Sequence, residues 1–400
     1  MVPHPETRGN MSESHVLDRP QEEQFDDVPT GVEFERFDSD SETQATIERP
    51  WDPESIRVST KSFSFRNILD MIEDGDLELA PDFQRNRVWK VSQKSSLIES
   101  ILLQIPLPAF YFAEDSEGML RVVDGLQRLS TVNQFVRDGE GDTFALTGLE
   151  YLADAKGKRF NQLPSPWRRR IYNTQIVVHV IDPTTPTGVK YDIFKRINTG
   201  GSPLNHQEIR HCMSKQRSRD FLRRCTHMEE FDLVTNGKLR DHVRMNDREM
   251  ALRFCAFLLL SEDAYEQEFQ AMDPFLEEAT ELLDDEQRVP DTQLEELADQ
   301  FRRAMVNAYA VFGEHAFRKW PYDIQWLSPI NRPLFETWSV VLSRYGVEDV
   351  RARRHNIVQE ARELMTNDQG YIAAITSSTG DPRKVAYRFA RTAEAAETGR

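Results

Sequence analysis

Cysteines and long apolar runs are scarce in this chain of 400 residues, and both absences exclude classes of protein. The three cysteines, Cys212, Cys225 and Cys255, are odd in number and far apart, which supports neither a disulfide framework nor a zinc site. No apolar run approaches the roughly 20 residues of a membrane-spanning helix, and no secretory signal opens the chain. We therefore expect a cytoplasmic protein with no membrane partner and no metal held by a cluster of protein ligands.

An overall excess of positive charge is missing too, since the net charge is −17. The charge is unevenly distributed. Positions 1–50 carry 13 acidic and four basic residues, and positions 261–300 carry 15 acidic residues and one basic residue. Positions 151–224, in contrast, carry 15 basic and five acidic residues. A basic zone in an acidic protein favours a polyanion such as DNA as the partner, although folding can disperse it over several faces.

Length and patterning indicate two or three folded units. Residues 1–50 are polar, acidic and rich in proline, and they are predicted to form a disordered tail. Residues 51–240 mix strand and helix patterns, whereas residues 241–400 show helical spacing alone. The predicted fold class is therefore α+β, with an all-helical extension at the C-terminal side. Its helices are expected over residues 247–260, 273–283, 294–312, 333–345, 350–364 and 384–395.

The most informative stretch reads Val-Asp-Gly-Leu-Gln-Arg-Leu-Ser and contains Asp124, Gly125 and Arg128. Two predicted strands, 109–113 and 119–123, form a hairpin that delivers Asp124 to a turn, and a helix begins directly after it. Such a turn gathers unpaired backbone N–H groups and the positive end of the helix dipole, and the guanidinium of Arg128 adds a planar donor, so the site suits a phosphate. The alternative is an ordinary turn whose Asp caps a surface helix.

Two further motifs flank this stretch in the chain. Pro-Asp-Phe-Gln-Arg-Asn-Arg-Val-Trp occupies 81–89, and Phe-Lys-Arg-Ile-Asn-Thr-Gly-Gly occupies 194–201. The ordered set resembles the GmrSD-type restriction endonuclease N-terminal domain family, which has a ParB/sulfiredoxin-like superfold, over roughly residues 60–260. The central motif of that family is usually Asp-Gly-Gln-Gln-Arg. In this chain Leu126 occupies the middle position.

The resemblance implies prokaryotic anti-phage defence against foreign, often base-modified, DNA through a nucleotide-binding and hydrolysing pocket. The implied cofactor is an NTP with Mg²⁺, and the implied class is hydrolase. The predicted catalytic residues are Asp124, Gln127, Arg128 and Glu208. The predicted nucleotide- or phosphate-binding residues are Gln84, Arg85, Gly125, Arg128, Arg196 and Asn198.

Multi-domain members of this family carry a C-terminal His-Asn-His nuclease, but His315 and His355 stand alone here. We therefore expect no such nuclease in this chain, which would either switch on a bound NTP or work with a separately encoded nuclease. Two other functions stay open. Asp124 and Glu208 could activate water against a flipped modified base, as in a DNA glycosylase. The chain could also be a non-enzymatic ParB-like module that only binds DNA or nucleotide.

Smaller signals also allow two interpretations. Trp167 precedes Arg168, Arg169 and Arg170, which predicts DNA binding through phosphate contacts and stacking, or alternatively a solvated helix start. Arg196 is predicted to form a second pocket wall, or alternatively to interact with the C-terminal end of its helix dipole. His206 and His211 lie five positions apart and so do not share a helix face, which argues against a zinc site.

Overall fold

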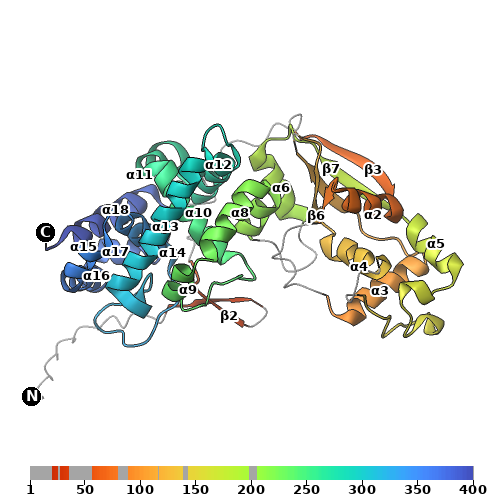
Figure 1. The fold of residues 1–400 in the computed structure, drawn as a ribbon, viewed down its shortest axis with the longest axis horizontal. Coiled ribbons are helices and arrows are strands. Elements are labelled where there is room, and N and C mark those ends of the chain that lie inside the picture. Colours follow the sequence, from red (N-terminus) through yellow and green to blue (C-terminus); the bar gives the residue numbers. More distant parts are fainter. Residues whose placement is uncertain are drawn as a thin grey trace, which may run out of the picture.

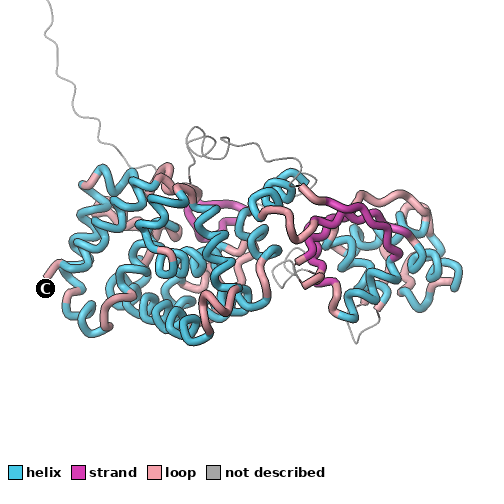
Figure 2. The backbone as a smooth tube through the Cα atoms, turned by 90° about the horizontal axis from the view of Figure 1, so that it is seen from above, coloured by secondary structure: helices cyan, strands magenta, loops and turns pink. Residues whose placement is uncertain are grey.

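A computed structural model of the chain describes residues 20–25, 28–35, 56–79, 89–115, 117–137, 143–197 and 205–399. These residues form two lobes, one built around a β-sheet and the other entirely from helices apart from a small N-terminal hairpin (Figures 1 and 2). The predicted α+β fold class with a helical extension is confirmed.

The sheet has five strands in the order β3-β7-β5-β6-β4. Strand β3 (Val58–Ser64) runs antiparallel to β7 (Gln175–Ile181), which in turn is parallel to β5 (Phe110–Glu114). Strand β5 is antiparallel to β6 (Leu120–Asp124), and β6 is parallel to the short edge strand β4 (Leu77–Glu78). The predicted hairpin therefore forms, and β7 joins it on the other side.

Helices cover one face of this sheet completely and the other face only in part. Apolar side chains of β5, β6 and β7 face a core that four helices complete, and Phe110, Phe112 and Val178 lie fully buried within it. These helices are α2 (Phe65–Asp74), α3 (Val91–Leu102), α4 (Leu126–Val136) and α5 (Ser165–Asn173). On the opposite face, α6 (Thr187–Ile197) and α7 (His206–Met213) contribute to a smaller cluster that contains Val123 and Ile181.

The helical lobe confirms the helices expected from sequence spacing, with one difference. The stretch predicted at 350–364 is two helices that meet at Arg353. The apolar core of this lobe includes Phe221 and Phe231, which precede the predicted boundary at residue 241, together with Trp338. The helices of this lobe are α8 (Gln216–Thr226), α9 (Glu229–Thr235), α10 (Asn246–Leu259), α11 (Ser261–Ala264), α12 (Met272–Asp284), α13 (Asp291–Phe312), α14 (Arg332–Leu342), α15 (Val347–Ala352), α16 (Arg354–Asn367), α17 (Gln369–Ala374) and α18 (Pro382–Glu397).

The predicted disordered tail is corrected where the chain forms β1 (Glu22–Phe25) and β2 (Val28–Glu33), an antiparallel hairpin on the helical lobe. The Glu33 N–H donates to the Ile330 carbonyl (2.8 Å), and the Glu33 carboxylate pairs with the Lys319 ammonium (2.6 Å). Val32 is fully buried beside them. The acidic residues whose abundance predicted disorder instead pair with buried cations of the helical lobe. Residues 1–19 and 36–55 lie outside the described residues.

Two further findings concern residue classes that the sequence analysis weighed. No described helix is both long and apolar enough to cross a membrane. Cys212, Cys225 and Cys255 are all free thiols and all buried. Burial raises the pKa of the Cys212 thiol to about 12, which makes it a poor nucleophile at neutral pH.

Candidate functional site

The turn between β6 and α4 depends on a glycine for two separate reasons. Asp124 is the last residue of β6, and Gly125 is the N-cap of α4 with φ +96°, in the left-handed region. A Cβ atom at this position would lie 2.2 Å from Cδ1 of Phe110, closer than side-chain atoms can approach. Only glycine therefore allows strand, turn and helix to follow one another so tightly over a buried aromatic ring.

The N-terminus of α4 has no side-chain cap among the described residues. The first main-chain bond of the helix is donated by Leu129 to the Gly125 carbonyl (2.9 Å). The preceding N–H groups of a helix have no partner within the helix itself, and the helix dipole places partial positive charge at the same point. This end of α4 can thus bind a phosphate or a carboxylate.

Arg128 contacts both Asp124 and the segment that enters β5. One guanidinium nitrogen donates to the Pro108 carbonyl (2.5 Å), and the other donates to the Ala109 carbonyl (3.1 Å) and to Asp124 Oδ2 (2.8 Å). The guanidinium also lies over the Phe110 ring, 4.2 Å from its centroid. Arg128 therefore ties α4 to the segment that enters β5. Burial lowers its pKa, and the Asp124 charge opposes this effect. A contact between Arg128 and phosphate stays a prediction.

Asp124 and Gln127 keep part of their hydrogen-bonding capacity. The Asp124 side chain is 35% exposed, and Arg128 is its sole hydrogen-bond partner in the part of the chain that the structure describes. Its Oδ1 atom therefore accepts no bond from those residues. The half-buried Gln127 amide likewise has no partner among them. Both side chains are thus chemically available for a water molecule, a cation or a ligand.

The end of α6 reaches the same region. Phe194 packs in one apolar cluster with Val123, the residue before Asp124. Arg196 follows in the last turn of α6 and is exposed. The structure therefore brings the predicted Arg196 towards the strand that ends at Asp124. Gln84, Arg85 and Asn198 lie outside the described residues.

Glu208, which the sequence predicted as catalytic, has a structural position in α7. It is fully buried, and its carboxylate accepts from the Asn205 backbone N–H (2.7 Å) while the Asn205 side chain accepts from the Glu208 N–H (2.8 Å). This reciprocal pair is a capping box. Arg244 also lies 3.4 Å from the Glu208 carboxylate. Asp124 takes no part in these contacts, and a catalytic role of Glu208 stays a prediction.

The basic zone of residues 151–224 is divided between two locations. Helix α5 carries Arg169 and Arg170 on its exposed surface and a half-buried Arg168. Several other cations of the zone instead pair with the acidic segment 261–300, which neutralises part of their charge. These pairs are Arg210–Asp273 (2.7 Å), Arg217–Asp291 (2.8 Å) and Arg224–Glu295 (2.6 Å). Net charge along the chain thus overstated the basic surface, and α5 is one exposed basic part of it in the sheet lobe.

Sequence reasoning missed a polar row that crosses the sheet beside Asp124. Tyr111 on β5 is the register partner of Asp124 on β6 and of His179 on β7, and His179 is the partner of Thr60 on β3. The Thr60 hydroxyl lies 3.0 Å from His179 Nδ1. These residues stand far apart in the sequence, so no local pattern could associate them.

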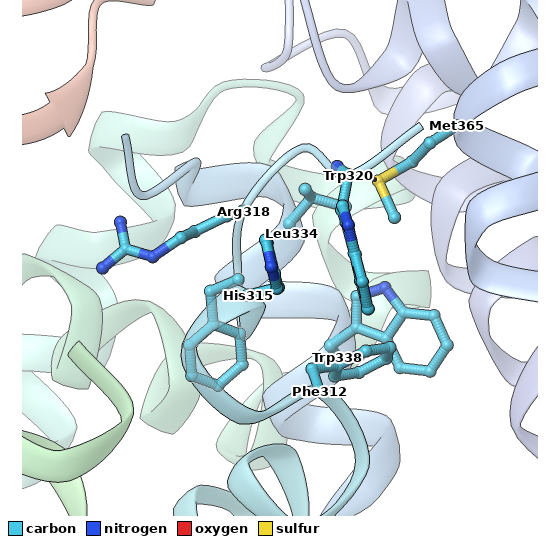
Figure 3. A pocket seen from close by; sticks show the side chains of 8 residues that line it. Phe312, His315, Arg318, Trp320, Leu334, Trp338 and Met365 are labelled. Atoms are coloured by element: carbon cyan, nitrogen blue, oxygen red, sulfur yellow. Dashed lines mark hydrogen bonds between the residues drawn. The ribbon is translucent and has the colours of Figure 1, made fainter. Parts of the chain in front are cut away.

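A small hollow lies in the helical lobe, away from Asp124 (Figure 3). Its cavity volume is about 10 Å³, which is room for about one water molecule. The His315 ring stacks on Trp320 with the centroids 4.1 Å apart, and burial lowers the pKa of that histidine. The hollow is too small for a nucleotide. Its lining consists of Phe312, His315, Phe317, Arg318, Trp320, Leu334, Trp338 and Met365.

Comparison with known proteins gives one match. Residues 65–214 match the family model of the GmrSD restriction endonuclease, N-terminal domain, and no curated protein matches the chain. The matched residues run from the start of α2 to the end of α7 and so contain the β6–α4 turn, Arg196 and Glu208. This family indicates a restriction-type defence protein. Through residues 65–214, the chain is therefore similar to the N-terminal domain of the GmrSD restriction endonuclease.

Proposed function

We propose that this restriction-type defence protein binds the phosphates of an NTP at the N-terminus of α4 and hydrolyses the nucleotide while acting on foreign DNA. The observation that carries the proposal is the uncapped end of α4 beside the half-exposed carboxylate of Asp124. Backbone N–H groups and a helix dipole recognise phosphate, and a carboxylate within the same turn can orient a water molecule.

The residues of the turn also fit the Mg²⁺ ion that accompanies an NTP. Mg²⁺ usually binds one or two carboxylates together with phosphate oxygens and water. Asp124 supplies one carboxylate whose Oδ1 atom has no described partner, and Arg128 holds the Oδ2 atom in place. When bound, the ion would neutralise phosphate charge. Arg128 keeps the Asp124 carboxylate oriented towards the end of α4, and Gly125 lets the helix begin there.

The glycosylase alternative receives less support. The hypothesis used both Asp124 and Glu208, and the Glu208 carboxylate is engaged in its capping box with Asn205. A module that binds DNA or nucleotide without turnover would use the same turn and would release no hydrolysis product. We further propose that a separately encoded nuclease cuts the DNA.

Asp124→Asn is expected to separate nucleotide binding from hydrolysis. The amide keeps the size of the side chain but loses the charge that a base or a metal partner requires, so turnover should fall at least about 100-fold. The NTP dissociation constant should stay within about threefold, because the N–H groups of α4 remain. Phosphate release and isothermal titration calorimetry measure the two quantities.

Asp115→Asn is the matched control for that substitution. Asp115 lies at the opposite end of the same hairpin, where its carboxylate pairs with Arg121 (2.9 Å). This variant should hydrolyse NTP at the wild-type rate. Full turnover in Asp124→Asn would make Asp124 a structural turn residue, and absence of NTP binding by the wild-type protein would overturn the proposed function.

Reversing Arg168, Arg169 and Arg170 to Glu is expected to weaken DNA binding and to flatten its salt dependence. Each lost phosphate contact lowers the slope of log K against log salt by about 0.9. Fluorescence anisotropy at several salt concentrations measures both effects. Reversal of Arg302, Arg351 and Arg383, which are exposed on the helical lobe, changes the net charge equally and serves as the control. Equal losses in the two triple variants would contradict a DNA contact at α5.

A further inference from the structure

Three side chains on adjacent strands form a continuous polar row. Thr60 of β3, His179 of β7 and Tyr111 of β5 are register neighbours. The Thr60 hydroxyl bonds His179 Nδ1 (3.0 Å), and the rings of His179 and Tyr111 lie 4.9 Å apart at an interplanar angle of 36°. Register neighbours project from the same face of a sheet, so the row presents two ring systems side by side.

This row lies at the border of the covered part of its sheet face. Tyr111 packs against the cluster that Phe194 of α6 forms with Ile181, and both Tyr111 and His179 are half-buried. Two positions before His179 on the same face, Val177 is 48% exposed. Helices α2 to α5 cover the other face, as Figure 1 shows. The two rings are therefore partly shielded from water and partly accessible, as a binding platform requires.

The register connects this platform to the proposed phosphate site. Tyr111 pairs with Asp124, and the pairing is irregular between Tyr111 and Phe112, where Val123 is the extra residue on β6. Such bulges change the direction of neighbouring side chains and are frequent at functional sites. Tyr111 is therefore paired with the last residue before α4, at the end of the sheet where the proposed phosphate site begins.

The chemistry of the platform matches a heteroaromatic ring with polar edges. The Tyr111 ring offers a stacking surface, and its hydroxyl has no hydrogen-bond partner in the described part of the chain. Thr60 occupies Nδ1 of His179, which leaves Nε2 to bond a polar atom of a ligand and makes Thr60 a positioning residue. Stacking of a base on an aromatic side chain typically changes affinity by about five- to 150-fold.

We propose that Tyr111 and His179 bind the nucleobase of the nucleotide whose phosphates lie at α4. In this arrangement the base stacks on Tyr111, and its edge bonds His179 Nε2. This inference rests on the proposed function, because the phosphate end of the ligand is the α4 site. It assigns residues that bind the base, which neither the family match nor the sequence motifs do.

The test compares an NTP with inorganic tripolyphosphate, each with Mg²⁺, by isothermal titration calorimetry on the full chain. Tyr111→Leu is expected to weaken NTP binding at least about tenfold and to leave tripolyphosphate binding within about twofold. Tyr111→Phe keeps the ring and should bind NTP within about threefold of wild type. Tyr151→Leu, at a tyrosine that is 72% exposed elsewhere on the sheet lobe, should change neither affinity. Circular dichroism checks that each variant is folded.

The outcomes separate the two proposals. If the wild-type protein binds both probes and Tyr111→Leu binds NTP normally, or loses both probes equally, the base site is wrong and the proposed function stands. If the wild-type protein binds neither probe, the proposed function fails as well. Binding of an oligonucleotide with an unpaired base, without binding of free NTP, would also overturn the inference. His179→Phe should weaken NTP binding while leaving tripolyphosphate binding within about twofold, and an unchanged NTP affinity would count against the role of Nε2.

Discussion

Gly125→Ala is expected to destabilise the sheet lobe by about 2–5 kcal/mol and to abolish NTP binding. The left-handed backbone at φ +96° costs a non-glycine residue about 1–2 kcal/mol. The new methyl group would also lie 2.2 Å from Phe110 Cδ1, and overpacking in a core costs about 1–3 kcal/mol more. Phe110 is fully buried and supports the Arg128 guanidinium, so relief of the clash must move the residues that orient Asp124. Urea denaturation and NTP titration measure the two effects.

Gly118→Ala is the matched control, because it has the same backbone strain without the clash. Gly118 lies in the β5–β6 hairpin with φ +85°, and a Cβ atom there would meet no atom within 4 Å. Its cost should stay at about 1–2 kcal/mol, with NTP binding unchanged. Equal destabilisation in the two variants would show that the contact with Phe110 does not determine the turn.

Glu336→Gln is expected to destabilise the helical lobe by about 3–5 kcal/mol, because it leaves the buried Arg388 without its counter-charge. Glu336 of α14 is fully buried and pairs with the equally buried Arg388 of α18. Its second oxygen accepts from Arg253 of α10 (3.1 Å). One carboxylate thus joins three helices in a region without water to solvate the guanidinium groups. The free energy of unfolding in urea measures the loss.

Glu348→Gln is the matched control at a solvated pair. Glu348 and Arg351 lie one helical turn apart (2.8 Å) with their side chains mostly exposed, and such a pair contributes less than about 1 kcal/mol. The double variant Glu336→Met with Arg388→Met should recover part of the stability, since it removes both charges together. A Glu336→Gln protein as stable as Glu348→Gln would refute the assigned role of the buried pair.

The sequence by itself determined the local elements around the motif. Two strand-like runs predicted the hairpin that delivers Asp124, and helical spacing predicted the helix after Gly125. Asn205 caps α7, as its residue type favours. These features depend on residues within a few positions of one another, where turn chemistry, capping and periodicity are sufficient. The three motifs likewise identified the GmrSD N-terminal domain before any contact was known.

Tertiary structure alone decided what those residues contact. Arg128 bonds carbonyl groups 19 and 20 positions earlier in the chain, so it also ties α4 to the segment before β5. Folding also buried Glu208 in α7 and placed the acidic hairpin of Glu33 against Lys319. The Tyr111 ring lies beside the His179 ring only because β5 and β7 are neighbours in the sheet. Burial and charge pairing depend on which distant segments come together, and composition and periodicity carry no information about that.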